Sequence, residues 1–492
     1  MQFDVLVIGG GPGGASAAAA LARHGRKVAL IESDTFPRFH IGESLLPMSN
    51  VVFERLGIDA KIRAAGFTKK YGACFLDEDD RHEIVYDFGV AMRDMQTHTW
   101  QVPRATFDAM LLQHATDSGA QRIHGRAKAA RFDANGVELD VTETSGAART
   151  LRAAVLIDAS GRAGFMARRD DLRVPDPELR KVAAYAHFTG IPRREGRRAG
   201  DIRVLSAKDL AWMWVIPLPD GVTSVGVVLD FDLYQQKSSG TGARPEPQAL
   251  LDEYMTRLPV AQKLFASAQR TSEVHFESTF SYRAKRWSGD RYLLVGDAAA
   301  FLDPVFSSGV MFAVRGGLDA ADAADRALRD GRPNAFDFAA YDAMQQERYR
   351  FVRRFVVGFY DPAFRDLFFA PKPGLGLVRA VTLVLAGFWS PGMLDRLRLK
   401  LMFHFARMQR KRAIVPRIHS KDLVATAPSR PAIGPQPKVS ALRAETDIAC
   451  RDGTVLAGAS RAARDTVGER SSPRNEPDEL LQPAKDRGTT GP

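Results

Sequence analysis

Three glycines near the start of the chain, and an acidic residue that follows them, have a spacing that could hold a dinucleotide. Gly9, Gly11 and Gly14 form a G-x-G-x-x-G pattern between an apolar run of strand length and an alanine-rich run that favours a helix. In this context the glycines permit a tight turn, a close approach of a diphosphate to the backbone, and close packing of helix on strand. A second apolar run ends in Glu32, where a carboxylate can bond a ribose hydroxyl.

A pair of tryptophans, Trp212 and Trp214, belongs to a short apolar stretch that ends at Pro217. Side chains alternate between the two faces of a strand, so we expect both indoles on one face and Met213 on the other. The pair could form the wall of a site. It could equally be ordinary packing in a sheet, because aromatic residues suit strands.

Further acidic candidates lie where expected strands end. Residues 155–158 form an apolar run that ends in Asp158 before a glycine turn, and residues 292–295 lead into Gly296 and Asp297 at an expected helix start. Asp158 could instead stabilise its own turn, and Asp297 could cap the helix. A site role and a local structural role stay open for both.

Several of these segments resemble those of known flavoproteins. The segments around Asp158 and Asp297 are similar to the second and third nucleotide-contacting segments of glutathione-reductase-type flavoproteins, which favours FAD over NAD. Arg104, in Val-Pro-Arg-Ala-Thr-Phe-Asp, resembles the arginine-bearing helix start of aromatic hydroxylases. The loop Gly42-Glu43-Ser44 could by itself be a linker. Together with the glycine pattern and Trp-x-Trp-x-Ile-Pro, however, it resembles the flavin-dependent halogenases of the phenol and pyrrole branch, over roughly residues 1–350.

This resemblance implies a chemistry and assigns roles to residues. Reduced FAD and oxygen would form a C4a-hydroperoxide, which a chloride or bromide ion would convert to hypohalous acid. Trp212 and Trp214 would separate the flavin from the organic substrate in a dry passage. The residues that the resemblance assigns to FAD are Gly9, Gly11, Gly13, Gly14, Glu32, Gly42, Glu43, Ser44, Arg104, Asp158, Gly296 and Asp297.

The same resemblance places the halogen-transferring lysine at Lys70 and the halide at the backbone N–H groups of Ser308 and Gly309. If the stretch is extended, Lys69 and Lys70 point to opposite sides, so only one of them can enter a site. Without the motif, two solvated lysines at a sheet edge would be the simpler interpretation. Tryptophan halogenases have a glutamate just before the halide turn, where this chain has Phe306, which favours an electron-rich phenol or pyrrole, free or tethered to a carrier protein.

The sequence also leaves other functions open. No second glycine pattern for NADPH is visible, so we expect a separate flavin reductase to supply reduced FAD. A flavin monooxygenase or a geranylgeranyl-reductase-like enzyme on the same fold is one alternative. A catalytically silent flavoprotein that acts as an assembly partner is another.

The elements that must position these residues form an α/β fold. We expect an FAD-binding Rossmann domain of the glutathione-reductase type, an inserted β-sheet substrate domain and a C-terminal helical segment. The expected FAD-binding domain comprises residues 1–70, 102–170 and 285–350. The expected substrate domain comprises residues 71–101 and 171–284.

The positive net charge of +11 is concentrated in one segment. Residues 1–350 contain 45 Lys+Arg and 45 Asp+Glu, whereas residues 351–420 contain 13 and 3. We therefore expect no nucleic-acid partner. The basic segment, residues 351–420, could cover the substrate mouth, dock an acidic carrier protein, or contact an anionic membrane surface. Residues 421–492 lack periodicity, and we expect them to be disordered.

Cysteine content is low, since only Cys74 and Cys450 occur. Neither a disulfide framework nor a cysteine metal site is expected from two distant cysteines. The chain starts directly with a strand pattern and shows no signal-peptide features. We expect a cytoplasmic protein, with the inner membrane face as an alternative location.

Overall fold

The structure is a computed structural model, and it describes residues 2–92, 97–238, 245–331, 333–371 and 375–419. The tail predicted to be disordered, residues 421–492, lies outside the described residues.

The N-terminal segment forms the centre of a seven-stranded sheet. β1 (Phe3–Ile8) pairs in parallel with β2 (Val28–Glu32) on one side and with β9 (Ala148–Asp158) on the other. Every side chain of β2 is buried, as expected for a strand that is covered on both faces. The other strands of this sheet are β7 (Gln121–Asp133), β8 (Gly136–Glu143), β18 (Ser288–Gly289) and β19 (Tyr292–Leu294).

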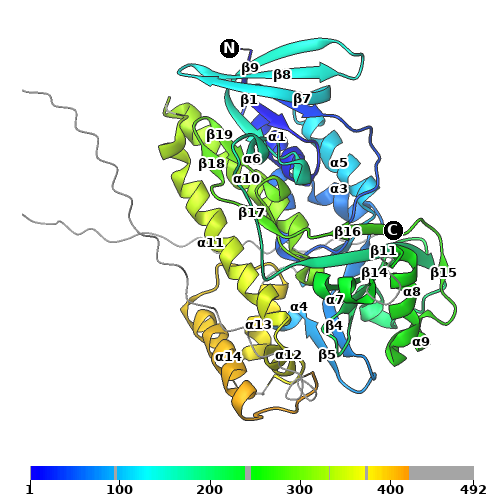
Figure 1. Ribbon diagram of the computed structural model, residues 1–492. Helices are drawn as coiled ribbons and strands as arrows, with labels where there is room; N and C mark the ends of the chain where they lie inside the picture. Colours follow the sequence, from blue (N-terminus) through cyan, green and yellow to red (C-terminus); the bar gives the residue numbers. More distant parts are fainter. Residues whose placement is uncertain (1, 93–96, 239–244, 332, 372–374, 420–492) are drawn as a thin grey trace, which may run out of the picture. The chain divides into compact units, whose positions relative to one another are not determined.

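Two helices pack against each other beside this sheet (Figure 1). α1 (Pro12–Arg23) is buried from Pro12 to Leu21, and α10 (Ser308–Arg329) crosses it at close range. A Cβ added at Gly317 would lie 2.2 Å from the carbonyl oxygen of Gly13. Only glycine at this position of α10 allows the two helix backbones to approach so closely.

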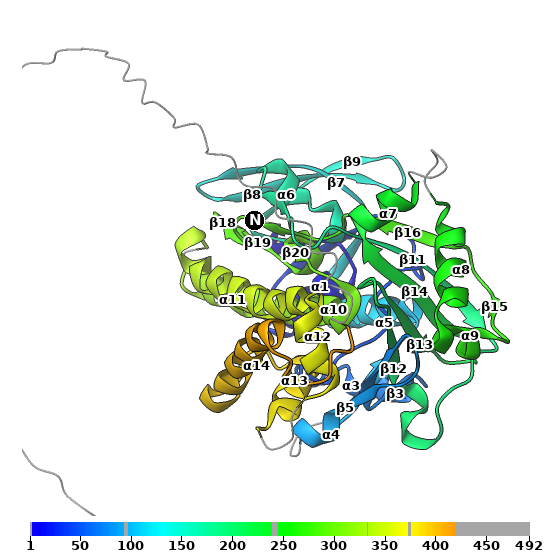
Figure 2. The same cartoon turned by 60° about the horizontal axis from the view of Figure 1, so that its bottom comes forward.

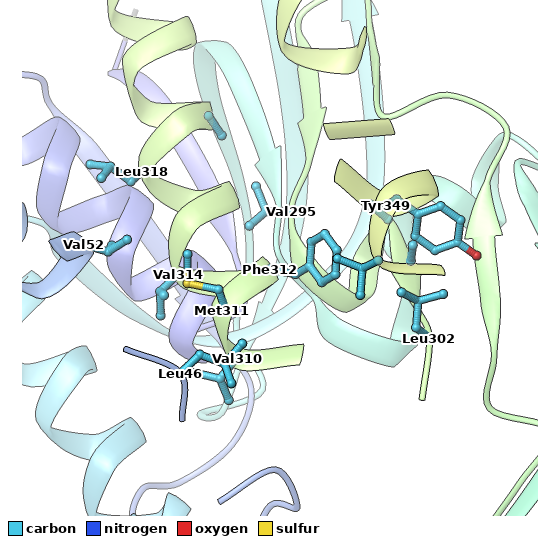
Figure 3. Close-up of a cluster of buried hydrophobic side chains, with 14 of the residues drawn as sticks. Leu46, Val52, Val295, Leu302, Val310, Met311, Phe312, Val314, Leu318 and Tyr349 are labelled. Atoms are coloured by element: carbon cyan, nitrogen blue, oxygen red, sulfur yellow. The ribbon is translucent and has the colours of Figure 1, made fainter. Parts of the chain in front are cut away.

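The first turns of α10 are fixed by apolar packing (Figure 3). Val310, Met311 and Val314 pack towards Leu46 and Val52, on the side of α2 (Met48–Leu56). Burial of each such side chain contributes about 1.5 to 3 kcal/mol. The N-terminus of α10 is therefore held firmly against the loop that precedes α2.

An eight-stranded sheet contains the tryptophan pair. β13 (Trp212–Pro217) pairs with β12 (Ile202–Ser206) and β14 (Thr223–Asp230). As predicted, Trp212 and Trp214 face one core, whereas Met213 faces a second core under α8 (Pro247–Arg257) and α9 (Pro259–Phe265). The remaining strands are β4 (Gly72–Asp77), β5 (Glu83–Asp87), β11 (Lys181–Thr189), β15 (Gln269–Arg270) and β16 (His275–Ser278).

Four helices near the C-terminal end of the described part pack on one another, and one of them, α13 (Leu377–Leu385), contacts α4 (Phe88–Ala91) and β5 (Figure 2). They are α11 (Ala335–Phe359), α12 (Pro362–Phe369), α13 (Leu377–Leu385) and α14 (Met393–Lys411). Among the described residues, no helix has an apolar stretch of the length that a membrane crossing needs.

The described residues also form the remaining helices and strands. They are α3 (Asp59–Ala64), β3 (Thr68–Lys70), β6 (Thr99–Gln101), α5 (Arg104–Asp117), η1 (Gly161–Ala163), α6 (Phe165–Arg169), β10 (Arg173–Pro175), η2 (Gly196–Gly200), α7 (Phe231–Ser238), β17 (Tyr282–Ala284), η3 (Gly296–Ala298), β20 (Ala300–Phe301) and η4 (Pro304–Phe306).

The predicted fold class is confirmed, while one local prediction is wrong. The strand that ends at Leu294 does not run into a helix at Asp297. Gly296 has φ +59°, so the chain turns through η3 and β20, and the helix starts only at Ser308. The boundaries predicted for the domains stay a prediction.

Candidate functional site

A cavity of about 880 Å³ collects most of the predicted site residues. Its lining comes from the ends of β1 and β2, the start of α1, the loop before α2, and the start of α10. Trp214 on β13 adds a wall from the other sheet. A site at the carboxyl ends of parallel strands is where a doubly wound sheet places its ligand.

One end of the cavity is a backbone surface at the start of α1. Gly9, Gly11 and Gly13 line it, and a Cβ at Gly11 would meet nothing nearer than Arg38 Nη2, 3.5 Å away. No side chain caps this helix N-terminus, so its N–H groups are available to an anion. Gly14 has a different role: a Cβ there would lie 1.8 Å from Gly9 O, and the residue does not line the cavity.

Acidic and basic side chains both line the cavity. Glu32 lines it and accepts hydrogen bonds from Gly10 N at 2.5 Å and Asp34 N at 2.7 Å. Burial raises the pKa of Asp297 to about 6, against the opposing charges of Arg104 and other arginines. Arg104 lines the cavity and donates to both carboxylate oxygens of Asp108, at 2.7 and 2.8 Å.

The loop Gly42-Glu43-Ser44 forms one side of the cavity. Glu43 is 1 % exposed, and its Oε1 lies 2.8 Å from His187 Nε2. Burial alone would lower the pKa of His187, but the hydrogen bond and the charge of Glu43 raise it. The other oxygen, Glu43 Oε2, is buried and has no hydrogen-bond partner. A buried acceptor without a partner is costly, which points to a ligand donor.

Lys70 lies directly behind this loop and does not line the cavity. Its side chain is 1 % exposed, whereas Lys69 is exposed, so the predicted alternation is confirmed. Lys70 Nζ donates to Ser44 Oγ at 2.9 Å and to Leu45 O at 3.0 Å. Burial lowers the pKa of Lys70 from 10.5 to about 7, while Asp201 acts in the opposite direction. Ser44, which lines the cavity, is thus the contact between Lys70 and the cavity.

The two tryptophans differ in their exposure to the cavity. Trp214 lines it and donates from Nε1 to Ser224 Oγ at 3.1 Å. Trp212 stands behind Trp214, with ring centroids 6.0 Å apart, and donates from Nε1 to Tyr360 Oη at 2.8 Å. Only one of the two predicted wall residues therefore touches the cavity directly.

The small-residue turn, residues 303–309, lines another part of the cavity. Asp303 Oδ1 accepts from Val305 N at 2.9 Å, and Ser307 has φ +53°. Ser308 and Gly309 then begin α10, whose N-terminus carries no side-chain cap. Free N–H groups at the start of a 22-residue helix suit an anion such as a halide.

Asp158 is separated from the cavity. Its carboxylate accepts from Ser160 N at 3.0 Å and from Met166 N at 2.7 Å. The lining residues nearby are instead Ala159, Ser160 and Gly161. This arrangement favours the turn-stabilising alternative for Asp158.

Sequence reasoning did not single out several residues that the fold adds to the site. Arg38, Arg126 and Arg162 line the cavity, while His187 and Tyr360 bond to residues of the site. Arg38 stands in the same loop as Glu43 and could have been noticed. The others come from distant segments in which no local motif marks them.

The residues present fit FAD. The bare glycine backbone and the uncapped helix suit a diphosphate, Glu32 suits a ribose, and Glu43 Oε2 offers an acceptor for a ring N–H. The cavity is also large enough for an extended dinucleotide.

Comparisons with known proteins agree with this assignment. A family model described as "FAD binding domain" matches residues 2–354. The flavin-dependent halogenase armH3 of Armillaria mellea is 35 % identical over 347 residues, which cover 67 % of this chain and 68 % of that protein. The 1H-pyrrole-2-carbonyl-[peptidyl-carrier protein] brominase of Pseudoalteromonas luteoviolacea is 32 % identical and matches 69 % of this chain and 81 % of its own length.

Solved structures lead to the same group of proteins. The flavin-dependent brominase Bmp2 superposes with a TM-score of 0.74 at 27 % identity, covering 83 % of this chain and 100 % of that chain. The flavin-dependent halogenase CmlS superposes with a TM-score of 0.68 at 30 % identity, covering 82 % of this chain and 70 % of that chain.

Proposed function

This chain belongs to the flavin-dependent halogenases, and on that premise we propose that it halogenates an electron-rich aromatic ring, phenolic or pyrrolic, presented by a carrier protein. It is an oxidoreductase that uses FAD and a halide. The observation that carries the proposal is one cavity lined by the glycine loop at the start of α1, by the uncapped start of α10, by Trp214 and by the serine that contacts Lys70.

Each group of residues has its own part in the reaction. Bound FAD, once reduced, supplies with oxygen the oxidising equivalent that converts the halide to hypohalous acid. The N–H groups of Ser308 and Gly309 hold the halide at the cavity end, without a charged side chain that the oxidant could attack. Trp212 and Trp214 keep the aromatic substrate away from the flavin and exclude water, which prevents direct hydroxylation.

Lys70 transfers the halogen. With a pKa of about 7, a substantial fraction of its side chain is neutral near neutral pH. A neutral amine can accept the halogen of hypohalous acid: the N–halogen bond forms, the O–halogen bond breaks, and the amine proton leaves with the hydroxyl group as water. The hydrogen bonds that Lys70 Nζ makes within the described residues go to Ser44 Oγ and Leu45 O, and burial outweighs the charge of Asp201, which favours the ammonium form. Ser44 lies between the cavity and Lys70.

The carrier protein is proposed from the surface of α14. Its exposed residues include large apolar side chains, with Met393 88 % and Leu397 53 % exposed, and no acidic residue. Five exposed basic residues share this surface, which suits an acidic partner. They are Arg396, Lys400, Arg407, Arg410 and Lys411. The name of the brominase relative gives a pyrrole-2-carbonyl group on a peptidyl-carrier protein as its substrate.

The surface of α14 is close to the site. α14 packs on α12, with Phe403 and Phe364 ring centroids 5.1 Å apart. In turn, Phe368 of α12 contacts Phe306 in the small-residue turn, with centroids 6.3 Å apart. A carrier docked on α14 would therefore be separated from the halide site by little more than one helix. A separate flavin reductase is the second proposed partner.

The first experiment tests the reaction. Purified protein, a flavin reductase, FAD, oxygen and a mixture of chloride and bromide are incubated with phenols, and with pyrrole-2-carbonyl groups on a carrier protein. Mass spectrometry should detect halogenated carrier-bound product. A hydroxylated product without halogen would contradict the proposal and favour a monooxygenase.

The second experiment tests the carrier surface. The double variant Lys400→Glu/Arg407→Glu should raise the KM for the carrier-bound substrate about tenfold or more, since charge reversal replaces attraction by repulsion. The matched control is Arg122→Glu/Lys128→Glu on β7, at the other end of the described part (Figure 1), which should leave the KM unchanged. An unchanged KM in the α14 variant, with loss of binding to anionic vesicles, would assign α14 to a membrane surface instead.

A further inference from the structure

Tyr360, the residue directly after α11, connects two parts of the proposed site that no local motif links. Its Oη accepts a hydrogen bond from Trp212 Nε1 at 2.8 Å. The same Oη donates to Asp303 Oδ2, also at 2.8 Å. One hydroxyl therefore joins the tryptophan strand β13 to the first residue of the small-residue turn.

Asp303 transmits this contact to the start of α10. It is 2 % exposed, and its second oxygen, Oδ1, accepts from Val305 N at 2.9 Å and so caps η4. Ser307 follows with φ +53°, a conformation that L-residues adopt only when the surroundings impose it. The direction of the Ser308 and Gly309 N–H groups thus depends on how Asp303 is held.

The surroundings of Tyr360 keep its hydroxyl protonated, so that it can donate a hydrogen bond. Burial and the charge of Asp303 raise the pKa of Tyr360 well above its ordinary value, so the hydroxyl stays protonated. Lys181 Nζ lies 3.7 Å from the centroid of the Tyr360 ring and 3.0 Å from Asp230 Oδ2. Burial raises the pKa of Asp303, while the hydrogen bonds from Val305 and Tyr360 and the charge of Lys181 act in the opposite direction.

We propose that Tyr360 is a positioning residue that fixes the placement of the halide-binding turn relative to Trp212 and Trp214. This inference rests on the proposed halide site at Ser308 and Gly309. Tyr360 touches neither of these residues and does not line the cavity, so it acts through Asp303 and Trp212.

The inference gives the C-terminal helical segment a part in the reaction. Tyr360 follows Phe359, whose ring contacts Phe306 of the turn with centroids 5.7 Å apart. The end of α11 therefore holds the turn by a hydrogen bond and an aromatic contact together.

The test is Tyr360→Phe, which removes both hydrogen bonds and keeps the ring. We expect the KM for halide to rise about tenfold, the free-energy equivalent of a lost hydrogen bond, with kcat at saturating halide within twofold of wild type. Hypohalous acid released to solvent, measured with a chemical trap, should rise at least twofold per oxygen consumed. FAD affinity should not change.

Tyr341→Phe is the matched control. Tyr341 is also buried on α11 and donates a single hydrogen bond, to Leu294 O at 2.7 Å, away from the turn. We expect a similar loss of thermal stability but an unchanged KM for halide. Equal halide KM values in wild type, Tyr360→Phe and Tyr341→Phe would overturn the inference.

A second variant covers the case in which Tyr360→Phe does not fold. Trp212→Phe removes the donor to Tyr360 together with part of the buried ring, and should raise the release of hypohalous acid with a smaller effect on the halide KM. An unchanged release would contradict the coupling. Failure of the proposed function is recognised separately, because wild type would then form no halogenated product at any halide concentration.

Discussion

Lys70 is a lysine in a buried environment that disfavours the charged form of its side chain. Its burial therefore does not stabilise the fold. Its side chain is 1 % exposed, and burial lowers its pKa from 10.5 to about 7. Below pH 7 the folded protein must bury an ammonium group that the unfolded chain exposes to water. Buried ionisable residues that cost stability are typical of functional sites.

The substitution Lys70→Met should therefore stabilise the protein. At pH 6 we expect the free energy of unfolding to rise by a few kcal/mol, on the order of 1.4 kcal/mol per pKa unit. Between pH 7 and 10.5 the unfolded chain binds more protons than the folded one, so wild-type stability rises with pH and the difference shrinks. Urea unfolding at pH 6 and pH 9.5 measures this difference.

Lys69→Met is the control for that prediction. Lys69 is exposed, and its substitution should change stability by no more than about 0.5 kcal/mol at either pH. A Lys70→Met protein that is less stable than wild type at both pH values would show that Lys70 is a structural residue.

At this scale the sequence predicted residue types better than contacts. The alternation of Lys69 and Lys70 followed from strand geometry and is confirmed. The hydrogen bond from Lys70 to Ser44 joins residues 26 positions apart and has no sequence signal. For Asp158, the motif suggested a role in the site. In the structure its carboxylate instead accepts hydrogen bonds from the backbone of the turn that follows it.

At the scale of elements, the turn between β1 and α1 separates two roles of glycine. A Cβ at Gly14 would lie 1.8 Å from Gly9 O, whereas one at Gly11 would meet only Arg38 Nη2 at 3.5 Å. Gly14→Ala should therefore lower the free energy of unfolding by about 3 kcal/mol or more through overpacking. Chemical denaturation measures it.

Gly11→Ala is the matched substitution with a different expected outcome. The protein should keep its stability within about 1 kcal/mol, while its affinity for FAD falls about tenfold or more because the methyl group faces the cavity where the diphosphate is expected. Fluorescence titration with FAD measures the affinity. Loss of stability in both variants, with equal effects, would contradict the two roles.

The strand that contains the tryptophan pair was predictable from its sequence. β13 covers the apolar stretch that ends at Pro217, with the expected alternation of its side chains. The turn at Asp297 was not predicted correctly, because the positive φ of Gly296 redirects the chain before a helix can start. Local conformations of this kind depend on packing against α10, which a window of sequence does not contain.

At the scale of the whole molecule, the site depends on contacts from the C-terminal helices. Among the described residues, those that line the cavity lie between Ile8 and Ala313, and Tyr360 adds its contact from the position after α11. A chain that ends at residue 427 should bind FAD and halogenate as the full chain does. Activity and FAD affinity of the shortened chain check this expectation.

A chain that ends at residue 350 is the contrasting case. It lacks Tyr360 and α12, whose Phe368 packs on Phe75 and Phe306 with ring centroids 4.7 and 6.3 Å apart. We expect this shorter chain to aggregate or to lose halide binding. Full activity would contradict the role given to the C-terminal segment.

Long-range partners mark the limit of prediction from the sequence. The fold class and the use of FAD follow from ordered motifs and are confirmed, while the binding of FAD by the glycine loop stays a prediction. Contacts such as Trp212 to Tyr360 and Glu43 to His187 span 148 and 144 positions, so only the folded chain brings them together. Burial, which sets the pKa of Lys70, is likewise a property of the whole fold.

The most direct test of the account compares wild type and Lys70→Met in the same reaction. Halogenated product and oxygen consumption are measured together, with reduced FAD, bromide and the carrier-bound pyrrole. We expect Lys70→Met to consume oxygen within twofold of wild type and to form at least about 100-fold less halogenated product. Halogenated product at the wild-type yield per oxygen would contradict halogen transfer through Lys70.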